Sequence, residues 1–300
     1  MRLSTISVLF MAACVSAAQP PAPAQQAPTL TFDGARAFND LRAMVEIGPR
    51  PSGSPAIEKT RDYIRKELTA AGLTVVEQAF DARTPKGTVH MVNLRATLPG
   101  TAQDKGRIVI GGHYDTKPIR EFRFVGASDA ASSAAFLLEI ARALKGRANP
   151  LPIELLFLDG EEAVVEWTGQ DHTYGSRYYV EQLKKANATK DVRAFILVDM
   201  IADKALGIRR EQNSTDWLTD AIWSAARRLN RPEFLEDSTP IEDDHLEFLA
   251  AGIESVDIID LDYPQWHTAD DTLEHVSARS LQTVGDVVLA ALPAIENRLK

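Results

Sequence analysis

The feature of the sequence that most constrains its fold is a short apolar segment that runs directly into two acids. Residues 153–158 read IELLFL, and Leu155–Leu158 form an unbroken apolar run. A run of this length is typical of a β-strand buried on both faces of a parallel sheet. Asp159-Gly160 ends the run, and Glu161 and Glu162 follow at once. The segment therefore predicts a central strand with two carboxylates at its carboxyl end.

The position of these two acids predicts a functional site. In open α/β sheets, ligands collect at the carboxyl ends of the strands. Because adjacent side chains diverge, one glutamate can bind a metal ion while its neighbour stays free to transfer protons. The alternative is a solvated acidic pair at the start of a helix, where the helix dipole favours negative charge. The rest of the chain favours the site.

The other expected strands alternate with expected helices. The strands are expected at residues 74–80, 90–96, 107–110, 153–158, 192–198 and 253–259. The helices are expected at residues 32–47, 55–71, 130–144, 171–185, 214–229 and 277–299. Such alternation predicts an α/β fold, a single-domain α/β/α sandwich with a mostly parallel, mixed central sheet. We find no internal repeat and no second linker in the sequence, which favours one folded domain over residues 32–300.

Composition narrows the class of protein. The chain has 300 residues, of which 45% are hydrophobic and 25% charged, as in soluble proteins with a sizeable core. A net charge of −9, without a basic cluster that includes aromatic residues, argues against a nucleic-acid partner. After residue 20 no apolar run approaches the length of a transmembrane segment, so none is expected.

The N-terminus has the pattern of an export signal. Residues 1–18 combine Arg2, a short apolar core and a small-residue cleavage site. The sole cysteine, Cys14, follows a sequence that resembles an imperfect bacterial lipoprotein box, so it is a candidate lipid anchor; cleavage after it is the alternative. Residues 19–31 begin with a Pro/Ala/Gln-rich tract and predict a disordered linker. We therefore expect an exported protein, periplasmic or secreted, either free or as a membrane-anchored lipoprotein.

Polar residues follow several of the expected strands and converge on one rim of the sheet. They are His113 with Asp115, Glu161 with Glu162, Asp199 and His267, and Asp129 precedes the helix expected at 130–144. Each alone has a structural explanation, such as a helix cap for Asp129 or a turn for Asp199. Together, oxygen and imidazole ligands without cysteine suit catalytic zinc, with three protein ligands and one open position.

At this point the sequence resembles a known family. The order HYD, GASD, DGEE, LVDMI and WH resembles the M28 zinc-peptidase family over most of residues 35–299. Within it, the strings FLDGEEA, Trp167, QD, YGSR, EDDH and WHTADD are most similar to the glutaminyl cyclase (glutaminyl-peptide cyclotransferase) branch. This resemblance implies an enzyme that acts on the N-termini of peptides or proteins.

The resemblance also implies roles for individual residues. One zinc ion would be held by Asp129, Glu162 and His267. Glu161 would shuttle protons, with Asp199 as its hydrogen-bonded partner and Asp243 as a second neighbouring acid. Trp167 and Trp266 would form walls of the substrate pocket, although on residue type alone plain packing is the alternative. In the two-metal aminopeptidases of the family, the positions of His113 and Asp199 hold a second ion, so these two residues fit both branches.

Three activities or states remain open from the sequence. The first is a transferase that uses one zinc ion to cyclise N-terminal glutamine to pyroglutamate. The second is an aminopeptidase with two zinc ions per chain, and the third is an inactive binding homologue. The chain departs from the cyclase pattern at Ala130-Ala131, Glu242 and Asp257, where that branch often carries serine, glutamine and histidine. These departures affect the expected proton network and leave the three zinc ligands intact.

Overall fold

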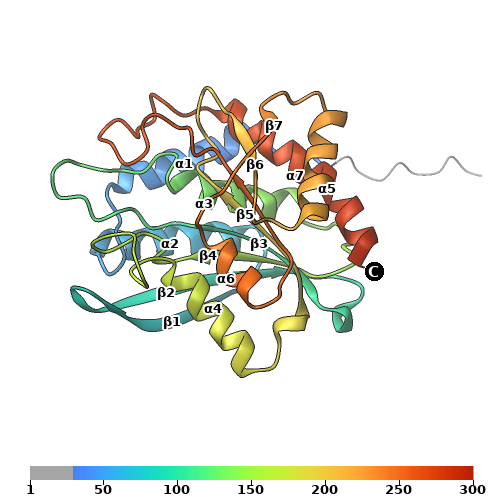
Figure 1. The fold of residues 1–300 in the computed structure, drawn as a ribbon, viewed down its shortest axis with the longest axis horizontal. Coiled ribbons are helices and arrows are strands. Elements are labelled where there is room, and N and C mark those ends of the chain that lie inside the picture. Colours follow the sequence, from blue (N-terminus) through green and yellow to red (C-terminus); the bar gives the residue numbers. More distant parts are fainter. Residues whose placement is uncertain (1–29, 300) are drawn as a thin grey trace, which may run out of the picture.

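A computed structural model describes residues 30–299 (Figure 1). The predicted signal peptide, the candidate anchor Cys14 and all but the last two residues of the predicted linker lie outside these residues. Between residues 30 and 299 we find no helix with the length and apolar character that a membrane span requires.

The core of the fold is a six-stranded mixed sheet with the strand order β1-β2-β4-β3-β5-β8. The strands are β1 (Val75–Thr84), β2 (Gly87–Leu98), β3 (Arg107–His113), β4 (Ile153–Leu158), β5 (Val192–Asp199) and β8 (Ser255–Ile259). The four strands β4, β3, β5 and β8 pair in parallel, whereas β1 and β2 form an antiparallel hairpin that joins the sheet through β4. The predicted mostly parallel, mixed sheet is confirmed.

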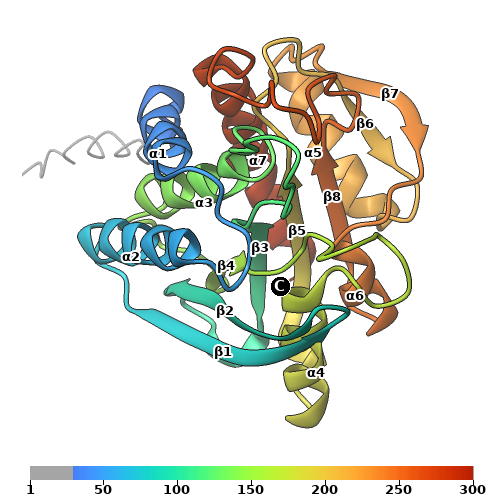
Figure 2. The same cartoon turned by 90° about the vertical axis from the view of Figure 1, so that its left-hand side faces the viewer.

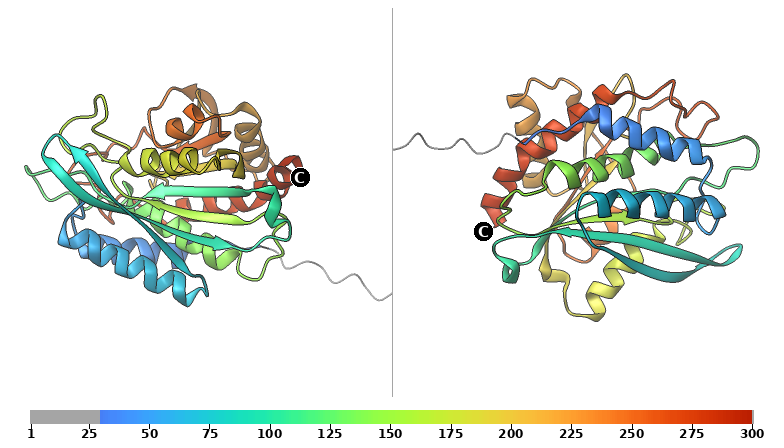
Figure 3. Two further views of the ribbon diagram at one scale, coloured as in Figure 1. Left: turned by 90° about the horizontal axis from the view of Figure 1, so that it is seen from below. Right: turned by 180° about the vertical axis from the view of Figure 1, so that it is seen from behind.

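Helices cover both faces of this sheet (Figure 3). The helices are α1 (Gly34–Ile47), α2 (Pro55–Ala70), α3 (Ala131–Ala143), α4 (Tyr174–Lys185), α5 (Asp216–Arg228), α6 (His245–Ala250) and α7 (Ala278–Leu299). Two short 3₁₀ helices span Gln103–Lys105 and Thr189–Asp191. Residues of α1, α2, α3, α5 and α7 pack into the larger apolar cluster, and residues of α4 and α6 pack into a second cluster on the opposite face. The α/β/α sandwich is therefore confirmed.

The central strand shows why the sheet is buried on both faces. Leu155 and Phe157 of β4 belong to the cluster beneath α1 and α3, whereas Leu156 and Leu158 belong to the cluster beneath α4 and α6. Successive side chains of a strand point to opposite faces, so an unbroken apolar run can only be satisfied between two layers of helices. Glu154, the one charged residue of the strand, is buried against the guanidinium of Arg95 at 2.9 Å.

Besides the two 3₁₀ helices, one α-helix and two strands were not expected from the sequence. Helix α6 and the strands β6 (Ile208–Glu211) and β7 (Phe234–Thr239) are short, and the two strands form a separate parallel pair beside β8 (Figure 2). Their sequences, IRRE and FLEDST, are largely polar and lack an apolar run. The hairpin β1–β2 is also longer than expected, because its outer half continues as a two-stranded ribbon with exposed polar side chains.

The start of one helix was predicted wrongly. Helix α4 begins at Tyr174 and not at the expected residue 171. The carboxylate of Asp171 accepts hydrogen bonds from the backbone N–H groups of residues 164, 165 and 166, and Thr173 has a left-handed backbone with φ of +47°. Local hydrogen bonding of this kind competes with helix formation, so the chain forms a loop before α4.

A buried arginine fixes the loop that leads from β3 to α3. Arg50 is fully buried, and its guanidinium donates hydrogen bonds to the backbone carbonyls of Tyr114, Val125 and Gly126 at 2.9, 2.6 and 3.0 Å. Burial lowers the pKa of Arg50 to about 10, so the side chain remains charged near neutral pH. At Gly126, φ is +54° and a Cβ atom would lie 1.8 Å from the carbonyl oxygen of Asp129, so this turn requires glycine.

We expect Arg50→Met to destabilise the protein by about 3–5 kcal/mol, because it leaves three buried carbonyl oxygens without a donor. Urea unfolding of the metal-saturated protein measures the loss. Arg279→Met is the matched control: this side chain is 84% exposed, so we expect a change within about 0.5 kcal/mol. An Arg50→Met variant as stable as the control would contradict this role.

Candidate metal centre

The predicted site residues gather around one cavity at the carboxyl end of the parallel strands. The cavity has a volume of about 280 Å³, and its walls also include the apolar residues Ile241, Ile259 and Leu261. Of the predicted site residues, eight line it: Asp129, Glu161, Glu162, Trp167, Asp199, Asp243, Trp266 and His267. His113, the ninth, is buried beside them at the end of β3.

Asp129, Glu162 and His267 form a group that fits a metal ion. Their ligand atoms all lie within 4.8 Å of one another. His267 Nε2 lies 3.1 Å from Glu162 Oε1 and 3.2 Å from Asp129 Oδ2. Asp129 Oδ2 is buried, and its ion-pair contact with His267 lacks the geometry of a hydrogen bond. Two carboxylate oxygens and one imidazole nitrogen that converge in this way are a typical donor set for a three-ligand catalytic site.

The electrostatics of this group also favour a cation. Burial disfavours the ionised form of Asp129, but its close contacts with the imidazoles of His113 and His267 outweigh this effect and hold its pKa below the usual range. Burial raises the pKa of Glu162, and the adjacent charge of Asp129 raises it further. Burial alone would lower the pKa of His267, yet its two carboxylate partners raise it to about 9. The carboxylates thus attract positive charge, which a metal ion supplies in place of the imidazole proton.

The backbone brings these three side chains together from different parts of the chain. Glu162 lies four residues beyond β4, and Asp129 lies two residues before the start of α3. His267 lies in the long segment after β8 and has a left-handed backbone with φ of +53°. Such a conformation is unfavourable for a non-glycine residue, so the surrounding structure has to hold His267 in place.

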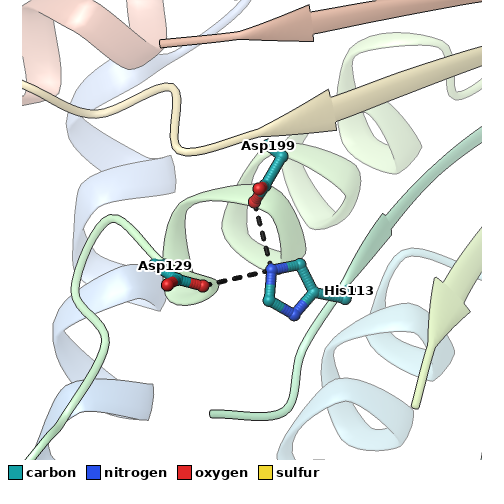
Figure 4. Close-up of side chains that lie close together, drawn as sticks. All are labelled: His113, Asp129 and Asp199. Atoms are coloured by element: carbon teal, nitrogen blue, oxygen red, sulfur yellow. Dashed lines mark hydrogen bonds and ion pairs between the residues drawn. The ribbon is translucent and has the colours of Figure 1, made fainter. Parts of the chain in front are cut away.

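A second group of candidate ligands shares Asp129 with the first (Figure 4). His113 Nε2 lies 3.1 Å from Asp199 Oδ1 and 3.3 Å from Asp129 Oδ1. All three side chains are buried. The group is compatible with a second ion, as the sequence predicted for His113 and Asp199, and it is equally compatible with hydrogen bonds that support the first group.

Glu161 lies beside the metal-type group and is buried. Its side-chain Oε2 lies 3.8 Å from His113 Nδ1, and its backbone N–H donates to Asp115 Oδ1 at 3.2 Å. Burial raises the pKa of Glu161 well above its ordinary value, and the nearby charges of Glu162 and Asp243 add to the effect against the opposing influence of His113. A carboxyl group in such surroundings can both accept and return a proton near neutral pH.

The described contacts of Asp199 and Glu161 converge on His113. Asp199 contacts His113, the hydroxyl of Ser133 at 3.3 Å and the backbone N–H of Met200 at 2.8 Å. His113 lies between the two acids, with Asp199 on its Nε2 and Glu161 on its Nδ1. The pairing of Asp199 with Glu161 therefore stays a prediction, and the imidazole of His113 is an additional partner of both acids that was not predicted from the sequence.

The two predicted tryptophans form walls of the cavity and are held differently. Trp167 stacks on His172 with ring centroids 4.2 Å apart, and its indole N–H donates to Glu242 at 3.1 Å. Trp266 stacks on His267 at 4.4 Å and is 44% exposed. An exposed indole beside a candidate ligand is available for contact with a bound molecule, unlike a tryptophan buried in the core.

Two further residues at the site were not predicted. Lys117 lies 3.2 Å from Glu162 Oε2 and lines the cavity. Asp271 accepts hydrogen bonds from the backbone N–H groups of Ser128 and Asp129 at 2.8 and 3.1 Å, and from the hydroxyl of Tyr263 at 2.9 Å. Both belong to strings next to predicted ligands, HYDTK and WHTADD, and this proximity was the available signal.

Comparison with known proteins gives one family. The model of peptidase family M28 matches residues 93–292. The glutaminyl-peptide cyclotransferase-like protein of Bos taurus is 31% identical over 265 residues, which cover 77% of this chain and 68% of the relative.

Solved structures agree with this family. The glutaminyl cyclase of an Acidobacteriales bacterium is 37% identical, with a TM-score of 0.87 over 93% of this chain and 100% of the other. A structure described as a leucine aminopeptidase precursor from Bacteroides thetaiotaomicron is 26% identical, with a TM-score of 0.80 over 87% and 97% of the two chains.

Proposed function

The chain belongs to peptidase family M28, and on this basis we propose that it is a zinc-dependent glutaminyl-peptide cyclotransferase. It would convert the N-terminal glutamine of a peptide or protein into pyroglutamate and release ammonia. The observation that carries the proposal is the convergence of Asp129, Glu162 and His267 on one point, with Glu161 beside them in an apolar, tryptophan-walled cavity.

Asp129, Glu162 and His267 would hold one zinc ion. Their donor set of two carboxylates and one imidazole matches catalytic zinc sites, and the buried Asp129 Oδ2, which makes no contact with hydrogen-bond geometry, supports the fit. When bound, the ion supplies a Lewis acid that polarises the side-chain amide carbonyl of the substrate glutamine. Lys117 is placed to balance the charge of Glu162, which it contacts at 3.2 Å.

Glu161 would move the proton. As the α-amine nitrogen attacks the side-chain amide carbon, the nitrogen loses a proton to the carboxylate of Glu161. The same carboxyl then gives this proton to the amide nitrogen, which leaves as ammonia when its bond to carbon breaks. No water and no redox partner enters this sequence. The raised pKa of Glu161 and the nearby Asp243 are consistent with a carboxyl that exchanges protons readily.

The cavity walls would favour cyclisation over hydrolysis. Trp167, Trp266 and the apolar side chains of Ile241 and Ile259 restrict the space available to water. An amine and an amide of one residue held in such a slot react as a pre-oriented pair, which supplies much of the rate.

The assay that tests this function is ammonia release from glutaminyl peptides by metal-analysed protein. Release of the N-terminal amino acid in place of ammonia would contradict it.

A two-metal aminopeptidase is the second candidate. The group formed by His113, Asp129 and Asp199 could accept a second ion, and one of the similar structures is described as a leucine aminopeptidase precursor. If this chain were such an aminopeptidase, its Glu161 would activate a water molecule. A metal count separates the two candidates, since the cyclase needs one zinc ion per chain and the aminopeptidase two. The third hypothesis from the sequence is an inactive binding homologue. When loaded with zinc, such a protein would release neither ammonia nor an N-terminal amino acid.

We expect Asp271→Asn to weaken zinc binding by about 10–100-fold, the usual effect of removing a group that orients a metal ligand. Asp271 fixes the backbone of Asp129, and an amide cannot accept both N–H groups equally. Competition with a chelating dye measures the affinity. Asp270→Asn is the control, because Asp270 is next to Asp271 in the sequence but its side chain is exposed. Equal zinc affinity in the two variants would contradict this role.

A further inference from the structure

Glu242 is the exposed charge at the mouth of the cavity. The other acids that line the cavity are buried, and Glu242 has a side chain that is 60% exposed. Lys117, a cation in the lining, is 22% exposed and lies against Glu162. A molecule that enters or leaves the cavity therefore passes a carboxylate whose charge is not balanced by this lysine.

The position of Glu242 is fixed by the wall of the cavity itself. Its Oε2 accepts a hydrogen bond from the indole N–H of Trp167 at 3.1 Å, and Trp167 stacks on His172. A carboxylate held by a stacked aromatic ring loses less conformational freedom when it binds a partner than a freely rotating one does. Glu242 is thus oriented beside the opening before any substrate arrives.

The neighbours of Glu242 leave its charge available. Between residues 30 and 299, no lysine or arginine forms an ion pair with it, and the nearest basic group is His172 Nε2 at 3.9 Å. Burial lowers the pKa of His172 below its ordinary value, so this imidazole is neutral at pH 7.5. The carboxylate of Glu242 therefore has no cationic partner within the described chain and can pair with a cation on a bound peptide.

We propose that Glu242 makes the enzyme prefer peptides with lysine or arginine directly after the N-terminal glutamine. The inference rests on the proposed function. The glutamine has to reach Asp129, Glu162 and His267 within the cavity, and consecutive residues are spaced about 3.8 Å apart. The second residue therefore lies at the opening, where a long cationic side chain reaches the carboxylate of Glu242 and an acidic one is repelled.

The test compares peptides that differ only in lysine or glutamate at the second position. An exposed ion pair and an exposed like-charge pair each change affinity by up to about fivefold, so we expect kcat/KM to favour lysine by roughly three- to tenfold. In Glu242→Gln the ratio should fall to about twofold or less, mainly through KM. Glutamine keeps an oxygen that accepts the Trp167 hydrogen bond, so the wall stays in place. High salt should also reduce the wild-type ratio.

Glu166→Gln is the matched control. Glu166 is one residue from Trp167 and exposed, but its side chain borders a separate hollow and not the cavity, so the ratio should remain at the wild-type value. An unchanged ratio in Glu242→Gln, or an equal fall in both variants, would overturn the inference. Binding of the pyroglutamyl product peptides can be monitored by tryptophan fluorescence. The ratio of their affinities, lysine over glutamate at the second position, measures the same charge preference without turnover. A charge preference in binding without any ammonia release would refute the proposed function and retain this role for Glu242.

Discussion

Replacement of Glu161 by glutamine is expected to lower kcat for cyclisation by about 10²–10⁴-fold, the range that a positioned general base contributes. Glutamine has nearly the same shape as glutamate but cannot take a proton from the α-amine. Glu161 is buried in the cavity beside the candidate ligands, and its backbone contact with Asp115 does not depend on the side chain. The variant should therefore fold normally and keep its zinc.

Two measurements separate this prediction from a structural defect. Initial rates of ammonia release from a glutaminyl peptide give the loss of activity, and elemental analysis gives the zinc content of the same sample. Asp270→Asn, a charge removal at an exposed position, serves as the control for expression and stability. A Glu161→Gln enzyme that retains wild-type turnover would refute the assignment of the base, and one that has lost its zinc would show that Glu161 also supports the ligands.

The second large effect is expected from His267→Ala, which removes one of three ligands. A ligand that binds only the folded state stabilises it by an amount that grows with the logarithm of the ligand concentration relative to Kd, about 4 kcal/mol at a concentration 1,000-fold above Kd. Zinc should therefore raise the melting temperature of the wild-type protein, and this rise should disappear in His267→Ala. Ammonia release should fall to background in the same variant.

The apo forms provide the control for this experiment. Without zinc, His267 is a partly exposed side chain, so we expect the metal-free variant to differ little from the metal-free wild type in its unfolding midpoint. Trp266, which stacks on His267, lies at the surface and does not anchor the core. Zinc stabilisation that persists in His267→Ala would place the ion elsewhere, with the group of His113, Asp129 and Asp199 as the alternative.

Much of the fold follows from local patterns in the sequence. The apolar run Leu155–Leu158 identified the central strand, since only a sheet covered on both faces can bury every side chain of such a run. The short strands β6 and β7 could not be identified in this way, because apart from the buried Ile208 and Phe234 their side chains are charged or at least partly exposed, and β6 packs against β8 from a distant part of the chain. The loop before α4 was missed for a related reason, since the Asp171 carboxylate engages N–H groups five to seven residues earlier in the chain.

The site was predictable to the extent that it depends on the ends of strands. His113 and Asp199 are the last residues of β3 and β5, and Glu161 lies three residues beyond β4. The three side chains meet at one rim of the sheet, as parallel strands require. The positions of Asp129 and His267 depend on contacts between distant residues. Asp271 bonds to the backbone of Asp129 across 142 residues, and no local pattern predicts such a contact. The resemblance to the M28 family identified Asp129 and His267 as metal ligands, which the periodicity of the sequence could not do.

The proposed function depends on one zinc ion that is coordinated by Asp129, Glu162 and His267. Anomalous diffraction at the zinc absorption edge, on crystals of the zinc-loaded protein, tests it directly. We predict one peak at about 2.0–2.2 Å from a ligand atom of each of these three side chains. A peak that none of the three side chains contacts, or a second peak of equal height between His113, Asp129 and Asp199, would contradict it.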